Sequence, residues 1–396
     1  MSVVRGDRLI VVDAIRGFAL MALFLVHMME SYELYWAAPK EDAVVHGIFL
    51  LFMGKSFSLL ALCFGFGFFA LMRGAAARGV DFSGRFVWRL IVLAAIGSLH
   101  ALIYRGDIIQ LLAMLGLMLP LFHRIKSNKL IVAIAAAFLL QPVLLIQFAL
   151  MFFGDGPGGA AGAALAGGDP AMPIYLHGDF SAVLRENLVD GQIAKWTFLL
   201  HSGRILQIAG LYLVGMVLGR VDFFGRLAEN VRARRVSLVV AVVIALMTHF
   251  AVAAMNHAAL HQFLSEDGHR LLGVVVGGWF DLAVTAMWVL LLCELWLSSA
   301  AFLLTPLASV GRATLSLYIL QSLIFVPLFY PFGLGVYDDW DSKTRLMAGL
   351  CGIAAQLITA RQWFAHFRYG PIEWVWRSLT YLRTDIPLRA SQSSAG

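Results

Sequence analysis

The sequence predicts an all-α, polytopic membrane protein with about ten transmembrane helices and both termini in the cytoplasm. The chain has 396 residues, of which 60% are hydrophobic and only 14% are charged, and its mean hydropathy is +0.81. Soluble domains carry about 25% charged residues. Nearly the whole chain is therefore expected to lie in the lipid bilayer. The net charge of +6 is modest, and we find no basic tract that would indicate a nucleic-acid partner.

Apolar runs along the chain indicate where it crosses the membrane. A spanning helix takes about 20 apolar residues, and fewer where the bilayer is thin. The third and fourth runs are joined only by Tyr104-Arg105-Gly106-Asp107, which predicts a tight turn. The fourth and sixth runs are the shortest. The predicted spans are 9–29, 47–72, 86–104, 107–123, 129–153, 205–220, 235–256, 271–298, 311–332 and 346–364.

The distribution of Lys and Arg sets the predicted orientation, because basic residues are enriched on the cytoplasmic side. With the N-terminus inside, the cytoplasmic segments hold twenty Lys and Arg residues and the opposite side holds eight. This alternation supports ten spans with both termini in the cytoplasm. We predict one transmembrane domain over residues 1–377 and a cytoplasmic tail over 378–396.

The longest extracytoplasmic loop is predicted over residues 154–204. Its opening, residues 154–162, is rich in glycine and predicts an irregular segment. Apolar residues at helical spacing between Phe180 and Ile193 predict an amphipathic helix that lies on the membrane or caps a cavity.

Five stretches of the chain resemble the motifs of one family. The opening stretch holds Asp13-Ala-Ile-Arg16-Gly17, and the two most specific stretches lie near the C-terminal end. Together they resemble the YeiB-like bacterial inner-membrane proteins, also called domain of unknown function 418. The resemblance implies a multi-pass protein of the bacterial cytoplasmic membrane. The five stretches are 8–20, 55–68, 97–109, 311–322 and 367–377.

The opening stretch is also similar to the start of the first helix in two groups of membrane acyltransferases, the heparan-glucosaminide N-acetyltransferase-like and acyltransferase-3 groups. This resemblance implies an enzyme that moves an acyl group from cytoplasmic acyl-CoA, such as acetyl-CoA, to an extracytoplasmic acceptor. The acceptor would be a sugar, a lipid or another small molecule. One departure is Val26-His27-Met28, where the glucosaminide enzymes have an Asn-His element.

Two other function classes fit the same sequence. A transporter or exporter of a small molecule would place polar residues in spans, with broken helices at mid-membrane. A non-catalytic membrane assembly protein would contain no cavity, and packing would explain every polar residue. We find no internal repeat that would favour the transporter.

Charged residues inside the predicted spans are candidates for binding, because each costs about 2.5–3.5 kcal/mol on insertion scales. Asp13 and Arg16 are three residues apart and share a helix face. They either neutralise each other to position the first helix or anchor the acyl donor. Lys55 either extends to the outer interface or supplies a cation to a cavity.

Histidine near the outer ends of the spans is the candidate catalytic group, because imidazole acts as a base at neutral pH. We select His100 as the base and Asp107 as the residue that orients it, if the turn folds back. The alternative for His100 is a hydrogen bond at a helix end. His257-x-x-x-His261 has metal-ligand spacing but lacks the accompanying Glu, and we predict no metal.

The stretch 311–322 supplies further candidates for substrate binding. Arg312 is a candidate for the phosphates of CoA. Tyr318, Gln321 and Ser322 either line a tunnel or make hydrogen bonds between helices. The pairs Gly215-x-x-x-Gly219 and Gly273-x-x-x-Gly277 are typical of close helix packing.

Overall fold

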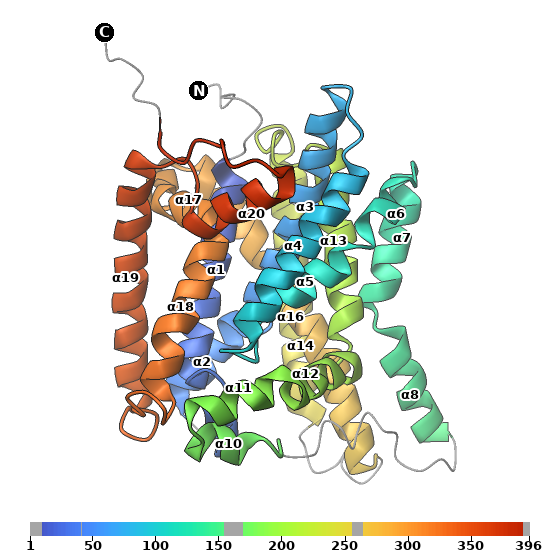
Figure 1. The fold of residues 1–396 in the computed structure, drawn as a ribbon. Helices are drawn as coiled ribbons and strands as arrows, with labels where there is room; N and C mark the ends of the chain where they lie inside the picture. The colour runs from blue at the N-terminus through green and yellow to red at the C-terminus, as the bar shows by residue number, and fades with distance from the viewer. Residues whose placement is uncertain (1–9, 41, 154–168, 256–263, 391–396) are drawn as a thin grey trace.

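A computed structural model describes residues 10–40, 42–153, 169–255 and 264–390. In these ranges the regular elements are helices, together with one isolated bridge between Phe367 and Arg389. The prediction of an all-α membrane protein is confirmed (Figure 1).

Long apolar helices account for half of the predicted spans. Five segments of the described chain are long and apolar enough to cross a membrane. They contain α1 (Ile10–Glu30), α2 (Ala43–Phe52) with α3 (Lys55–Ala76), α4 (Ser83–Ala101), α14 (Val231–Met255) and α16 (Glu266–Leu297).

Three bent helix pairs raise the number of candidate spans to eight if each pair crosses once. The bends are 44°, 69° and 81° in chain order. The pairs are α7 (Asn128–Leu139) with α8 (Pro142–Phe153), α12 (Asp190–His201) with α13 (Arg204–Arg220), and α17 (Thr305–Arg312) with α18 (Thr314–Phe329).

The two remaining predicted spans are helical but are not among these candidates. Residues 107–123 form the short α5 (Ile109–Gly116) and α6 (Leu119–His123), and residues 346–364 lie in α19 (Ser342–His366). The number ten therefore stays a prediction, as does the side of the membrane that each end faces.

The helices alternate between two ends of the bundle (Figure 1). α10 (Met172–His177), α11 (Phe180–Leu188) and α12 lie across the lower end in this view, and α20 (Pro371–Tyr381) lies across the upper end. The predicted amphipathic helix is α11, which ends at Leu188, and α12 begins at Asp190. The glycine-rich residues 154–162 lie outside the described ranges.

The boundary predicted for a C-terminal tail, at residue 378, lies inside a helix of the structure. α20 continues to Tyr381, and the segment after it packs back on the bundle. The Arg368 N–H donates to Leu388 O at 2.8 Å, and the Ala390 N–H donates to His366 O at 2.8 Å. Backbone pairing therefore reaches the last described residues, and the division into a domain and a tail stays a prediction.

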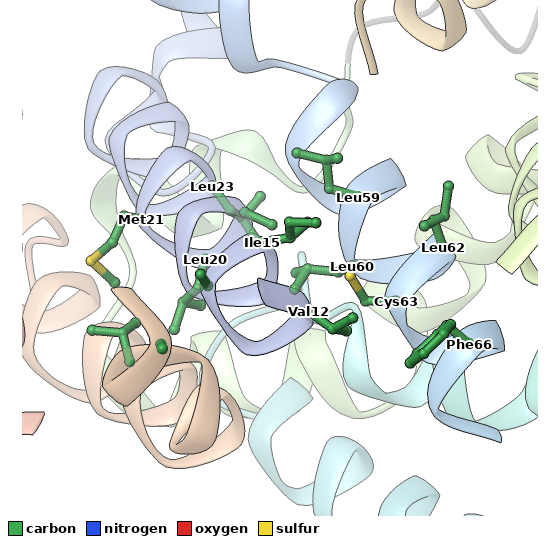
Figure 2. Close-up of a cluster of buried hydrophobic side chains, with 14 of the residues drawn as sticks. Val12, Ile15, Leu20, Met21, Leu23, Leu59, Leu60, Leu62, Cys63 and Phe66 are labelled. Carbon is green, nitrogen blue, oxygen red and sulfur yellow. The ribbon is translucent and has the colours of Figure 1, made fainter. Parts of the chain in front are cut away.

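Helix α1 lies at the centre of the bundle and is buried along most of its length. Val12, Ile15 and Leu20 of α1 pack with Leu59 and other residues of α3 in the main hydrophobic cluster (Figure 2). The apolar side chains of α1 therefore contact protein rather than lipid. Polar groups on the same helix are also held away from lipid.

Two glycines let α1 cross α17 with their backbones in contact. A Cβ atom on Gly17 would lie 1.9 Å from Leu307 O, and one on Gly311 would lie 1.8 Å from Asp13 O. The motifs 8–20 and 311–322 therefore meet at this crossing. A side chain on either glycine would overlap the backbone of the other helix.

The two glycine pairs have different roles. A Cβ atom on Gly215 would lie 2.0 Å from Leu62 O, so the prediction of close packing is confirmed for α13 against α3. No heavy atom of the described residues lies within 4 Å of a Cβ atom placed on Gly273 or Gly277. The packing prediction is wrong for this second pair, because both glycines line a cavity.

Replacing Gly311 with Ala should destabilise the protein, because the added methyl group forces α1 and α17 apart. Overpacking of this kind costs roughly 1–3 kcal/mol. We expect a lower melting temperature of the detergent-solubilised protein. Gly67→Ala is the matched control, since no heavy atom in the described parts of the chain lies within 4 Å of its Cβ position. Equal melting of the two variants would contradict the described crossing.

Candidate functional site

His100 and Asp107 form a buried pair where α4 turns into α5. The Nδ1 atom of His100 lies 2.7 Å from Oδ1 of Asp107, and the two residues are 4% and 2% exposed. An ionised carboxylate only accepts hydrogen bonds, so Nδ1 carries the proton in this contact. In a neutral imidazole the other nitrogen, Nε2, is then free to accept a proton.

The tight turn predicted between these residues is present and folds back as expected. The Asp107 N–H donates to Tyr104 O at 3.2 Å, and Asp107 Oδ2 accepts from the Gln110 N–H at 2.8 Å. Asp107 thus supports the first turn of α5 as well as holding His100. A Cβ atom on Gly97 would lie 2.5 Å from Gln110 N, so this glycine allows α5 to approach α4.

Aromatic side chains and a second histidine surround His100. The ring of Tyr318 lies 5.2 Å from that of His100, and its hydroxyl accepts from the Ile108 N–H at 3.3 Å. The ring of His27, from α1, lies 5.3 Å from that of Tyr104 and 6.2 Å from that of Tyr318. His27 is not predictable as a member of this cluster from sequence, because only the packing of α1 brings it here.

Two nitrogen atoms at this site make no hydrogen bond to the described residues. They are Nδ1 of His27 and Nε2 of His100, and both are buried. In proteins the great majority of buried polar atoms make a hydrogen bond, so each exception needs an explanation. Two unpaired imidazole nitrogens on neighbouring helices are a reason to regard this cluster as functional.

Polar contacts close the cluster on the side of α10 and α11. Arg105 lies 2.8 Å from Glu33 Oε2 and also pairs with Asp169. Burial alone would lower the pKa of the Arg105 guanidinium, but these two carboxylates raise it, so the group stays charged. Asn187 of α11 donates from Nδ2 to Leu102 O at 2.9 Å. These contacts hold α11 against the bundle, and whether it lies on the membrane or caps a cavity stays open.

The candidate donor-binding residues lie towards the opposite end of α1. Arg16 Nη1 is 3.6 Å from Asp13 Oδ1, with the Arg16 side chain 37% exposed. Arg312 lies over the ring of Phe364 at 3.8 Å and donates to Arg368 O at 3.1 Å. Because Gly17 and Gly311 meet at the helix crossing, these cations belong to one end of the bundle.

The other polar residues of the stretch 311–322 point in different directions. Gln321 Nε2 donates to Gln356 Oε1 of α19 at 2.7 Å, which is a bond between helices. Ser322 Oγ is 3.5 Å from the carbonyl of Tyr318 in its own helix. Only Tyr318 among the predicted residues of this stretch contacts the His100 pair.

Lys55 forms a second buried polar cluster that is separate from His100. Its Nζ lies 2.8 Å from Asp281 Oδ1, and Nη1 and Nη2 of Arg204 each lie 3.2 Å from Asp281 Oδ2. Lys55 is 4% exposed, so it does not extend to the interface. Arg204 and Asp281 line a cavity of about 380 Å³, and neither was selected from the sequence.

No group of three or more His, Cys, Asp or Glu side chains within the described ranges is placed to hold a metal ion. His257 and His261, which have metal-ligand spacing, lie outside those ranges.

The fold and these sites define a class: an all-α, polytopic membrane protein with ionisable groups buried inside its helix bundle. A family described as "Protein of unknown function (DUF418)" matches residues 218–383, which include the two C-terminal motifs. The chain is 24% identical to the uncharacterized protein YxaH of Bacillus subtilis over 95% of each chain. It is 25% identical to the uncharacterized protein YeiB of Escherichia coli over 94% of this chain and 96% of that one.

These matches support a YeiB-like protein of the DUF418 type. The family resemblance expected from the five motifs is confirmed. The activity of these relatives is not established by their names, so the chemistry of this chain is argued from its own residues.

The closing motif has a structural role that can be tested. Glu373 Oε1 accepts from the Leu315 N–H at 2.7 Å and the Ser316 N–H at 3.2 Å, and Oε2 accepts from Ser316 Oγ. This carboxylate therefore caps α18 after the 81° bend and ties α20 to it.

Replacing Glu373 with Ala should destabilise the protein by about 0.5–2 kcal/mol, the usual cost of losing a helix cap. Thermal unfolding in detergent measures the loss. Glu266→Ala is the control, because that side chain is 87% exposed and pairs with Arg270 at 3.4 Å. A Glu373→Ala variant as stable as the control would show that the cap contributes nothing.

Proposed function

We propose that the chain is a transmembrane acyltransferase of the bacterial cytoplasmic membrane. It would move an acyl group from cytoplasmic acyl-CoA to an extracytoplasmic acceptor, with His100 as the base and Asp107 as its orienting partner. The observation that carries the proposal is the 2.7 Å contact between these side chains, with His100 Nε2 buried and making no hydrogen bond to the described residues. An aspartate that fixes the tautomer of a catalytic histidine is a recurring arrangement in acyl transfer.

The proposed chemistry is attack by an acceptor hydroxyl or amine on the thioester. Nε2 of His100 takes the proton of the acceptor as its oxygen or nitrogen bonds to the acyl carbon. The carbon–sulfur bond then breaks, the CoA thiolate leaves, and the protonated His100 returns the proton to it. Asp107 stabilises the imidazolium that forms between these steps. A sugar, a lipid headgroup and a small metabolite all supply the required nucleophile.

The donor would enter from the end of the bundle that holds Asp13, Arg16 and Arg312. Arg16 precedes His27 by eleven positions on α1, which is roughly 16 Å along a helix. The pantetheine arm of CoA is an extended, flexible chain that suits such a span. Ile15, Leu20 and Leu23 of α1 belong to a hydrophobic cluster, and His100 is closed to solvent. The proposal therefore includes an opening movement that admits both substrates.

A transporter is the second candidate, favoured by the broken helices. Discontinuous helices surround substrate sites in many transporters. Gln141 lines the cavity near Asp281, as do Ser202 and Arg204 on either side of the break at Gly203. The break at Gly54 lies against Asp281 itself. That cavity also disfavours an assembly protein in which packing explains every polar residue.

The acyltransferase proposal is tested with purified protein in liposomes, labelled acetyl-CoA and a bacterial membrane extract as the source of acceptors. We expect CoA release and labelled product. His100→Ala should lower the rate about 10²–10⁴-fold, the usual contribution of a general base. Asp107→Asn should also lower the rate, because the amide no longer fixes the tautomer.

His249→Ala is the matched control, because His249 lines the separate cavity near Asp281. Equal melting temperatures of the variants and the parent protein would exclude unfolding as the cause of a lost rate. The proposal is wrong if the parent protein releases no CoA or if His100→Ala turns over normally.

A further inference from the structure

Three helix breaks meet around Asp281. Gly54 separates α2 from α3, Gln141 separates α7 from α8, and Gly203 separates α12 from α13, with φ of +79°, +56° and +68°. A Cβ atom on Gly54 would lie 2.1 Å from Asp281 Oδ2, and one on Gly203 would lie 3.0 Å from Gln141 Oε1. The three breaks therefore form one site rather than three separate irregularities.

Side chains of the bundle donate hydrogen bonds to backbone carbonyl groups freed at the break before α3. Trp288 Nε1 donates to Leu51 O at 3.1 Å, and Ser56 Oγ donates to Phe52 O at 2.6 Å. These bonds serve the carbonyl groups at the end of α2.

The helices that start at the breaks, α3, α8 and α13, have 22, 12 and 17 residues. Their N-termini carry partial positive charge and favour an anion.

The side chains add a net positive charge to the same place. Lys55 and Arg204 share the single carboxylate of Asp281. Gln207 Oε1 also accepts from Arg204 Nη1 at 2.8 Å. A guanidinium has five N–H donors, and these contacts take three of them. An uncompensated charge in a membrane protein is costly and indicates a functional partner.

Two polar atoms beside Arg204 make no hydrogen bond to the described residues. They are Oγ of Ser202 and Oε1 of Gln141, in residues that are 6% and 2% exposed. Both residues line the cavity of about 380 Å³. This volume is within the range of small-molecule sites, about 300–1,000 Å³. The cavity thus has polar groups at the breaks that a ligand would satisfy.

Most of the remaining lining of the cavity is apolar, and His46, Gln207 and His249 are its other polar residues. Gly273 and Gly277 of α16 leave space that no described side chain fills. The apolar lining residues are Leu50, Phe198, Val252, Val274 and Phe280.

We infer that this cavity binds an anionic amphiphile, that is, a carboxylate or phosphate head on an apolar chain. Arg204 and Ser202 contact the head beside the N-termini of α8 and α13, and Lys55 supplies positive charge from behind Asp281. The apolar wall and the space over Gly277 hold the chain. This site is separate from His100 and does not depend on the proposed acyl transfer.

Equilibrium binding of radiolabelled decanoate to the full chain tests the inference. The protein is placed in nanodiscs of phosphatidylcholine, and empty nanodiscs give the blank. Decyl phosphate should displace decanoate, whereas decyltrimethylammonium, with the same tail and a cationic head, should not. Inorganic phosphate should compete at least tenfold more weakly than decyl phosphate, because it lacks the chain.

Two variants remove the two halves of the site. Arg204→Gln should weaken decanoate binding at least tenfold by removing the head-group contact. Gly277→Leu should do the same by filling the cavity without a backbone clash, and it keeps the test valid if Arg204→Gln does not fold. Gly67→Leu is the matched control, because its Cβ position is also open but Gly67 is not among the cavity-lining residues. His100→Ala should bind decanoate normally.

Nanodiscs that contain phosphatidylglycerol identify the source of the anion. If this lipid competes with decanoate, the cavity binds an anionic lipid. If it does not compete and decanoate still binds, the cavity binds a free amphiphile. Both results support the site. Equal displacement by the cationic amphiphile, no saturable decanoate binding, or unchanged binding to Gly277→Leu would overturn the inference.

Discussion

A helix in a bilayer cannot break unless the freed backbone groups find partners inside the protein, because lipid offers none. Two carboxylates meet this constraint where the chain turns or bends, and a third carboxylate lies at a helix break. Asp107 accepts from the Gln110 N–H at the start of α5, and Glu373 accepts from the Leu315 N–H at the start of α18. Asp281 fills the space over Gly54 and pairs with Lys55. The irregular parts of the bundle are therefore also its most polar parts.

The two candidate sites follow from this constraint in different ways. At the first, Asp107 uses one oxygen for the backbone of α5 and the other for His100, so the support of the turn also fixes the imidazole. At the second, helix N-termini and two cations gather around one carboxylate and leave a net positive charge beside an apolar cavity. The first arrangement is suited to moving a proton and the second to holding an anion.

The sequence predicts what is local and misses what depends on distant contacts. The contact of His100 with Asp107 was predictable, because a short turn joins them. The residue before Pro142 is biased away from helix, and this bias is a local signal for the break at Gln141. The continuous apolar run around it instead predicted a single span over 129–153. Asp281 and His27 reach their partners only through packing. The glycine spacing at Gly273 misled, because an open cavity and a close helix contact both require a missing side chain.

The tautomer of His100 shows whether Asp107 holds this imidazole as a buried base. Nitrogen NMR of histidine-labelled protein at neutral pH reports which ring nitrogen carries the proton, and the signal that disappears in His100→Gln gives the assignment. The account predicts a proton on Nδ1 and none on Nε2, with the pattern changed in Asp107→Asn. A proton on Nε2 of the neutral ring, or a spectrum unaffected by Asp107→Asn, would contradict it.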